Sequence, residues 1–255
     1  MNMNTFLLGM LAAVVTAPIA IYAISLRRDL ASQGPAAPAA VQTAEPLPSE
    51  PSEPEPPAIV KSPEALQAED ACIGCQLANA SLEARDLSRV NLSQSDLSNA
   101  TLSDSQLVNA IFQQAQLTAA QLVNVNGSGA DFRAANLYQA DLTRSQLIYI
   151  NLVEANLDDA ILQEAELREA ALNKATLQNA DLTDASLYGA ILRDVNFAGA
   201  NLQGADLRYT DLTNANFQGA ILVNVQLEGA VLPDGSNYSG AEDILLLSGE
   251  GDGQD

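Results

Sequence analysis

The chain contains no histidine and no tryptophan, and it has only two cysteines among its 255 residues. The lack of histidine excludes a serine–histidine–aspartate triad and every metal site built on imidazole ligands. Cations are scarce as well: 11 lysines and arginines stand against 32 acidic residues, for a formal net charge of −21. Nucleic acids and anionic lipid surfaces are therefore poor partners. Because no phosphate-binding loop or nucleophile elbow appears either, we interpret the chain as non-catalytic, with no cofactor and no small-molecule substrate.

A bulky apolar residue recurs at every fifth position from Leu77 to Leu232. Leucine fills all but five of these 32 positions; phenylalanine fills four, and Gly127 is the exception. Two residues before most of them stands a small residue, most often alanine. Five residues turn an α-helix by about 500°, and a strand repeats every two residues, so neither places these leucines on one face. The repeat is its own architectural unit.

The run from Ala200 to Arg208, A-N-L-Q-G-A-D-L-R, and its neighbours resemble the pentapeptide-repeat family, A-(D/N)-L-x-x. The resemblance covers residues 75–234 without a shift of frame. It implies an all-β solenoid, a right-handed quadrilateral β-helix of about eight coils. Four pentads form one square coil, and the central residue and the small residue point inward. At about 4.8 Å per coil, eight coils form a rod of roughly 40 Å.

The twenty-residue coil makes two local predictions. Phe112 stacks on Phe132, and Phe197 stacks on Phe217, because each pair is separated by 20 residues. Gly127 lies in a run of asparagine, serine and glycine that is typical of turns. It is either a tolerated defect with a small void, or a bend or docking notch.

Residues 1–29 are predicted to be a transmembrane anchor with a basic flank. The stretch 6–26 is apolar, uncharged and long enough to span a bilayer. A cleavable signal peptide is the alternative. Arg27 and Arg28 follow the stretch, so the positive-inside rule predicts a cytoplasmic repeat domain; a periplasmic or lumenal one is the alternative.

Three further segments flank the repeats. Residues 30–61 are rich in proline, alanine and glutamate and are predicted to be a disordered spacer, with a proline-rich partner-binding motif as the alternative. Residues 62–74 are predicted to form an N-terminal cap with a short helix that begins at Ser62-Pro63-Glu64. Residues 235–255 are predicted to form an acidic C-terminal cap and tail, in which Ile244–Leu247 close the last coil or pair with a second molecule.

Cys72 and Cys75 form a C-x-x-C motif at the start of the repeats. In the five-residue frame both occupy inward positions. Buried thiols are the simplest interpretation. A disulfide is the alternative, and it would indicate an oxidising compartment.

One face of the predicted β-helix carries most of the aromatic residues. Pentads centred 20 residues apart, from 87 to 227, contribute three of the four tyrosines in the repeats, together with several arginines. Tyrosine and arginine are favoured at protein interfaces. The candidate partner-binding residues are Ile148, Tyr149, Arg168, Tyr188, Arg208 and Tyr209.

The sequence as a whole predicts a membrane-tethered scaffold or protein-interaction module that binds a protein partner or another copy of itself. The alternative comes from the family resemblance. Some pentapeptide-repeat proteins are acidic, DNA-like rods that bind type II topoisomerases, and this chain shares the acidic excess.

Overall fold

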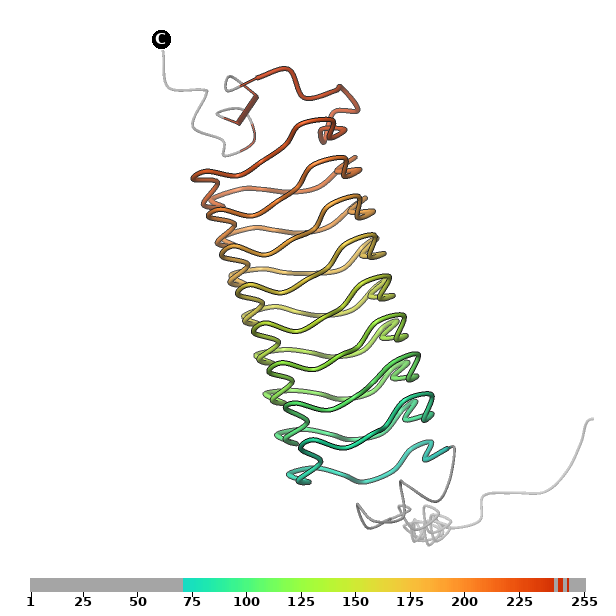
Figure 1. Ribbon diagram of the computed structural model, residues 1–255. Helices are drawn as coiled ribbons and strands as arrows, with labels where there is room; N and C mark the ends of the chain where they lie inside the picture. The colour runs from blue at the N-terminus through green and yellow to red at the C-terminus, as the bar shows by residue number, and fades with distance from the viewer. Residues whose placement is uncertain (1–70, 241–242, 245–246, 248–255) are drawn as a thin grey trace, which may run out of the picture. The chain divides into compact units, whose positions relative to one another are not determined.

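The computed structural model describes residues 71–240, 243–244 and 247. Within them, every fifth residue from Ala71 to Asp211 forms a parallel β-bridge with the residue 20 positions later. Successive bridges on one wall, from Ala71↔Asn91 to Asp211↔Val231, delimit eight stacked coils. Figure 1 shows these coils rising from the cyan N-terminal end to the red C-terminal end. Each wall contributes one bridged residue per coil, so the sheet is built from single bridges rather than long strands.

Each corner of the coil is a tight turn with a left-handed residue. The second residue after every pentad centre from Cys72 to Leu227 has a positive φ, and 25 of these residues are not glycine. The next small residue donates a backbone hydrogen bond to the centre, as in Ala80 N to Leu77 O at 3.0 Å. This bond and the positive φ are features of a type II turn. The left-handed residue also donates to the coil above, as in Asn79 N to Ser98 O at 2.8 Å, which helps to offset its conformational cost.

Aspartate or asparagine stands before many of the centres and has a structural role there. Its side-chain Oδ1 accepts a hydrogen bond from the N–H two residues later, as in Ser98 N to Asp96 Oδ1 at 3.0 Å and Thr183 N to Asp181 Oδ1 at 3.0 Å. Backbone carbonyls accept hydrogen bonds from the other four N–H groups of the pentad, and the side chain of the Asx turn accepts the hydrogen bond from the fifth. The preference for aspartate or asparagine at this position follows directly.

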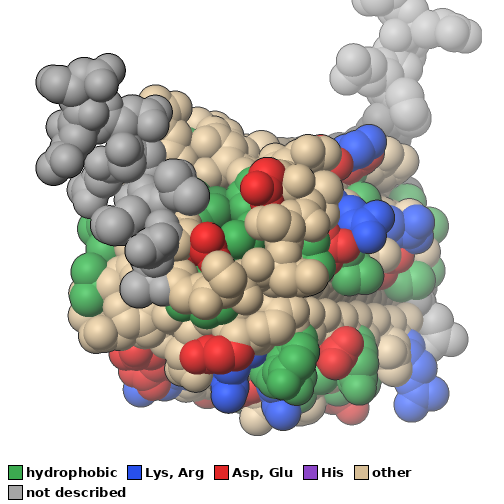
Figure 2. All heavy atoms as spheres, turned by 90° about the horizontal axis from the view of Figure 1, so that it is seen from above, with side chains coloured by type: hydrophobic (Ala, Val, Ile, Leu, Met, Phe, Trp, Pro, Cys, Tyr) green, Lys and Arg blue, Asp and Glu red, His purple; other side chains and the backbone are tan. Residues whose placement is uncertain are grey.

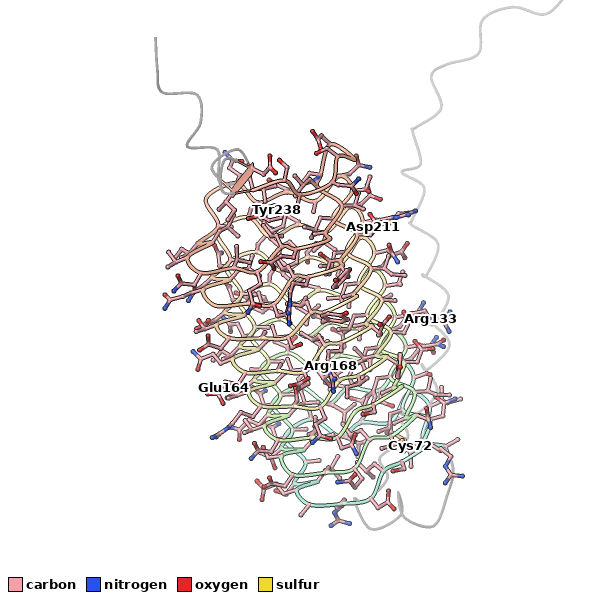
Figure 3. All side chains as sticks on the ribbon, turned by 45° about the horizontal axis from the view of Figure 1, so that its top comes forward. Cys72, Arg133, Glu164, Arg168, Asp211 and Tyr238 are labelled. Atoms are coloured by element: carbon pink, nitrogen blue, oxygen red, sulfur yellow. A yellow bond between two sulfur atoms is a disulfide. The ribbon has the colours of Figure 1, made fainter. Side chains whose placement is uncertain are left out.

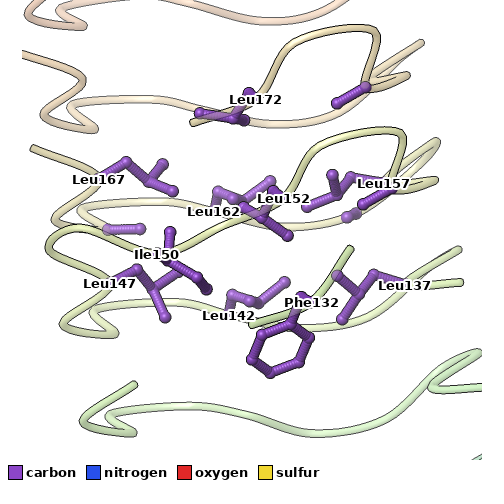
Figure 4. Close-up of a cluster of buried hydrophobic side chains, with 14 of the residues drawn as sticks. Phe132, Leu137, Leu142, Leu147, Ile150, Leu152, Leu157, Leu162, Leu167 and Leu172 are labelled. Carbon is purple, nitrogen blue, oxygen red and sulfur yellow. The ribbon is translucent and has the colours of Figure 1, made fainter. Parts of the chain in front are cut away.

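The interior is filled by the pentad centres and the small residues. Leucines of successive coils stack along each wall, as Figure 4 shows from Phe132 to Leu172. Both predicted phenylalanine stacks are confirmed: the ring centroids of Phe112 and Phe132 lie 4.4 Å apart, and those of Phe197 and Phe217 lie 5.1 Å apart. Four polar side chains are also buried, and all have hydrogen-bond partners: Ser95, Ser105, Ser145 and Thr210.

Gly127 neither bends the wall nor interrupts the ladder. Its N–H donates to Gln146 O at 2.8 Å, and the bridge Asn126↔Gln146 is intact. A Cβ atom placed on Gly127 would lie 2.9 Å from Cδ2 of Leu147, so this leucine leans into the space that a larger side chain would use. Of the two predictions for this site, the tolerated defect is therefore the one that the structure supports.

The N-terminal end of the ladder differs from the predicted boundary, whereas the C-terminal end has a closing segment after residue 234, as expected. The first bridge is at Ala71, so residues 71–74 belong to the first coil and not to a separate cap. At the other end, Val231 pairs with Asn237 in antiparallel fashion, and Tyr238 N donates to Ala230 O at 3.0 Å. Tyr238, Ile244 and Leu247 are partly buried against the core there. Figure 2 looks along the rod from this end and shows hydrophobic side chains among the polar ones.

Several predictions lie outside the described residues. They are the membrane anchor over 1–29, the spacer over 30–61, the helix that begins at Ser62, and the acidic tail beyond residue 247. Among the residues that the structure does describe, no helix combines the length and apolar character needed to cross a bilayer.

Candidate functional site: the tyrosine–arginine face

The tyrosine–arginine face is the wall whose pentad centres run from Leu87 to Leu227 in steps of 20. The first turn residue of each of its pentads lies directly below the corresponding residue of the next coil, because backbone hydrogen bonds connect adjacent turns. We call this row the face column. In order along the rod, it contains Ser88, Val108, Ser128, Ile148, Arg168, Tyr188, Arg208 and Glu228.

The centre of the face is a contact cluster of four side chains. The rings of Tyr188 and Tyr209 have centroids 5.2 Å apart and are inclined at 59°. The guanidinium carbon of Arg208 lies 5.6 Å from the centroid of the Tyr188 ring, within the range of a cation–π contact. Arg208 in turn donates from Nε and Nη2 to the two carboxylate oxygens of Asp206, at 2.8 and 2.7 Å. A two-point ion pair of this kind fixes the plane of the guanidinium group.

Arg168 repeats part of this arrangement two coils earlier. Its Nε lies 2.9 Å from Oε2 of Glu166. Between the two ion pairs lies a shallow hollow of about 420 Å³, lined by Glu166, Arg168, Ser186, Tyr188, Asp206 and Arg208. Figure 3 labels Arg168 on the middle of the rod. The hollow is open and polar, which suits a partner's side chains better than an enclosed small molecule.

Glycine residues flatten part of this surface, and the sequence interpretation did not anticipate this. A Cβ atom on Gly229 would lie 2.6 Å from Cδ1 of Tyr209, so the tyrosine ring lies across this glycine. In the same way the carboxylate of Glu169 lies across Gly189. A side chain at either glycine would push its neighbour away from the wall. The signal in the sequence is a glycine 20 residues after a large side chain at the second turn position.

The six predicted residues do not all form one cluster. Arg168, Tyr188, Arg208 and Tyr209 line or border the hollow. Ile148 is the neighbour of Arg168 in the face column, one coil earlier. Tyr149 N donates to Arg168 O at 3.0 Å, while the residue is 68 % exposed and extends the face toward the N-terminal end.

The ion pairs also determine the local electrostatics. Hydrogen bonds from the guanidinium group of Arg208 hold the pKa of Asp206 below its ordinary value, and the same bonds raise the pKa of Arg208. Both groups therefore remain charged throughout the physiological pH range. None of the described acidic residues gathers with others into a group able to hold a metal ion. The face presents fixed charges and aromatic rings.

Cys72 and Cys75 form a disulfide within the first coil. Ser95, one coil later, braces the same turn: its hydroxyl donates to Cys72 O at 2.7 Å and accepts from Cys75 N at 3.0 Å. The leading interpretation, two buried free thiols, is therefore wrong for this structure, which shows the alternative, a disulfide. Figure 3 places Cys72 near the N-terminal end of the rod, opposite Tyr238.

These observations define the chain as a β-solenoid repeat protein whose surface is organised in columns. The model for pentapeptide repeats matches residues 75–114, 110–147, 150–189, 180–219 and 196–233, more than half of the chain. The chain belongs to the pentapeptide-repeat family. Membership of this family implies that the β-helix is right-handed and quadrilateral. Comparison with curated protein sequences gives no match.

Solved structures of other pentapeptide-repeat proteins are similar. Trypsin-treated QnrB1, a plasmid-mediated fluoroquinolone resistance protein, is 21 % identical, with a TM-score of 0.51 over 69 % of this chain and 83 % of its own. HetL, involved in heterocyst differentiation regulation in the cyanobacterium Nostoc sp. strain PCC 7120, is 29 % identical over 65 % of this chain and 92 % of its own, with a TM-score of 0.35. A pentapeptide-repeat protein from the Arabidopsis thaliana thylakoid lumen is 24 % identical over 55 % of this chain and 69 % of its own, with a TM-score of 0.26. The likeness to QnrB1 concerns the fold alone.

Proposed function

We propose that this chain is a non-catalytic protein-interaction module that binds its partner through the tyrosine–arginine face. The observation that carries the proposal is the cluster around Tyr188, in which two aromatic rings and a guanidinium group are held by Asp206 and Gly229. Preordered aromatic and arginine side chains lose little conformational entropy on binding, and such residues dominate binding energies at interfaces.

A crosslinking experiment tests this function. A photoreactive phenylalanine analogue replaces Tyr149 in cells, and illumination should yield one discrete adduct. The same analogue at Gln139, which occupies the equivalent turn position on another wall, is the matched control and should yield none. Tyr188→Ser combined with Tyr209→Ser should abolish the adduct. An adduct that survives this double change would show that the face is not the binding site. An adduct of twice the chain's mass would identify a second copy as the partner, and an internal crosslink that leaves the mass unchanged would identify a segment of the same chain.

We further propose that residues 6–26 tether the module to a membrane. The length and apolar character of this stretch support the tether. The side of the membrane is a separate question. Arg27 and Arg28 favour a cytoplasmic rod, whereas the disulfide between Cys72 and Cys75 is typical of an oxidising compartment. Since the structure contains the disulfide, we favour the extracytoplasmic side.

A second candidate function is an acidic DNA mimic that binds a type II topoisomerase. The net charge of −21 and the shared fold with QnrB1 favour it. An extracytoplasmic rod would not meet such an enzyme. A supercoiling assay with purified full-length protein decides between the two: inhibition of a type II topoisomerase by stoichiometric protein would support the mimic, and unchanged supercoiling would eliminate it.

A further inference from the structure

From Val108 to Arg208 the face column alternates in chemical character, and Glu228 ends the pattern. Val108, Ile148 and Tyr188 lie two coils apart, and Ser128, Arg168 and Arg208 occupy the coils after each of them. Because adjacent coils are about 4.8 Å apart, apolar side chains recur along the column about every 9.6 Å. The two arginines are separated by the same interval. The column is thus a linear array with a repeat of two coils.

A polyproline II helix has nearly the same repeat. It has three residues per turn and rises about 3.1 Å per residue, so every third side chain recurs at about 9.3 Å along one edge. The mismatch with the column is about 0.3 Å per repeat. The α-helix fits worse, because two of its turns advance about 10.8 Å. In a β-strand, side chains on one face recur about every 6.7 Å.

The chemistry of the column also suits such a ligand. Tyrosine-lined grooves bind proline rings, since the polyproline helix is already extended and loses little entropy on binding. Arg208 uses Nε and Nη2 for Asp206, so none of the hydrogen bonds described here occupies its Nη1. The side chain of Arg168 is 51 % exposed beside its partner Glu166. Both guanidinium groups can therefore donate hydrogen bonds to an additional carboxylate from a ligand.

The chain itself carries a sequence with this spacing. Prolines occur at every third position from Pro48 to Pro57, and Glu50 and Glu53 are likewise three residues apart. In a polyproline II helix the four prolines would share one edge, and the two glutamates would share another. Their spacing matches that of the apolar residues and of the two arginines in the column.

We propose that the face column binds a polyproline II segment with proline at every third residue and glutamate between the prolines, and that residues 48–57 of this chain are its ligand. This inference rests on the proposed function and names the ligand of the same face. The length of the chain permits the contact: residues 58–70 can extend to at most about 45 Å, whereas five coils of the rod rise about 24 Å.

Fluorescence anisotropy with a labelled peptide of residues 46–58 tests the proposal on the full-length protein in detergent micelles. The receptor carries Pro51→Ala and Pro54→Ala, so that its own segment does not compete. The peptide should bind, and Tyr188→Ser should weaken binding at least about tenfold, a loss of about 1.4 kcal/mol. Ile148→Ser, two coils away in the column, should also weaken it. Tyr138→Ser, at the equivalent turn position on another wall, is the matched control and should leave binding unchanged.

A second peptide of identical composition, with its prolines grouped together, tests the spacing. Equal binding of the two peptides, or no binding of either, overturns the proposal. Peptide binding that is weak in the wild type and stronger in the proline-substituted receptor supports residues 48–57 as the native occupant. If the peptide fails while the Tyr149 crosslink remains sensitive to the tyrosine changes, the proposed function holds and only the ligand is wrong.

Discussion

Asp181 offers the sharpest test of how the pentad is held together. Its carboxylate accepts four hydrogen bonds: from Thr183 N at 3.0 Å, Thr183 Oγ1 at 2.5 Å, Gln163 Nε2 at 2.7 Å and Asn201 Nδ2 at 3.3 Å. Each net hydrogen bond contributes about 0.5–1.5 kcal/mol, with the lower half of this range appropriate to a half-buried site. Asp181→Ala should therefore reduce the free energy of unfolding by about 2–3 kcal/mol.

Asp181→Asn should cost much less, about 1 kcal/mol, because the amide oxygen still accepts from the backbone N–H of Thr183. Ala171 provides the opposite case, since it occupies the same position of its pentad and has no side-chain acceptor for Asn173 N. Ala171→Asn should supply that acceptor and stabilise the protein by about 0.5–1 kcal/mol. Urea titration followed by circular dichroism gives all three values. Equal losses for Asp181→Ala and Asp181→Asn, or a loss for Ala171→Asn, would refute the role assigned to the Asx turn.

Three further predictions follow from the packing, the charges and the disulfide. Leu157→Ala, in the middle of the rod, should reduce the free energy of unfolding by about 3–5 kcal/mol. Leu222→Ala should reduce it clearly less, because Leu222 lies in the last coil and has no complete coil above it. Equal losses in urea titration would contradict nearest-neighbour packing. Burial acts to raise the pKa of Asp181, but the hydrogen bonds from Thr183, Gln163 and Asn201 outweigh it and leave the pKa lowered. The carboxylate therefore contributes its full stability above the ordinary aspartate pKa of about 3.9, and this contribution is lost as the pH falls below that value. The wild type should lose more stability than Asp181→Asn between pH 6 and pH 3, as urea midpoints at the two pH values would show. A cysteine at Gln163, in a chain with Cys72→Ala and Cys75→Ser, should react with an impermeant maleimide on intact cells; labelling only after lysis would place the rod in the cytoplasm.

The sequence was sufficient to predict the solenoid, because the repeat is a local rule applied many times. Each leucine at a pentad centre lies inside, and the phenylalanine pairs stack as the twenty-residue coil requires. The start of the ladder was harder to predict, since Ala71 and Cys72 fit the bridge and centre positions although they lack the family's usual leucine.

The details of the surface could be predicted only in part. The five-residue frame placed Tyr188, Arg208 and Tyr209 on one wall, but not the positions of their side chains. Those depend on Asp206, which holds the guanidinium group, and on Gly229, which leaves room for a ring. The state of Cys72 and Cys75 was also open, because a buried pair of thiols and a disulfide occupy the same two inward positions.

Different interactions hold the two ends of the rod, and this difference predicts the end at which unfolding begins. A solenoid frays from its terminal coils, since each of them has only one neighbour. At the N-terminal end a disulfide locks the turn from Cys72 to Cys75, and the hydroxyl of Ser95 holds this turn to the second coil, whereas the last coil is covered by a single antiparallel bridge and a few partly buried side chains around Tyr238. Stepwise unzipping under heat or mechanical load should therefore begin at the C-terminal coil and travel toward Cys72, and chemical reduction should allow it to start from both ends.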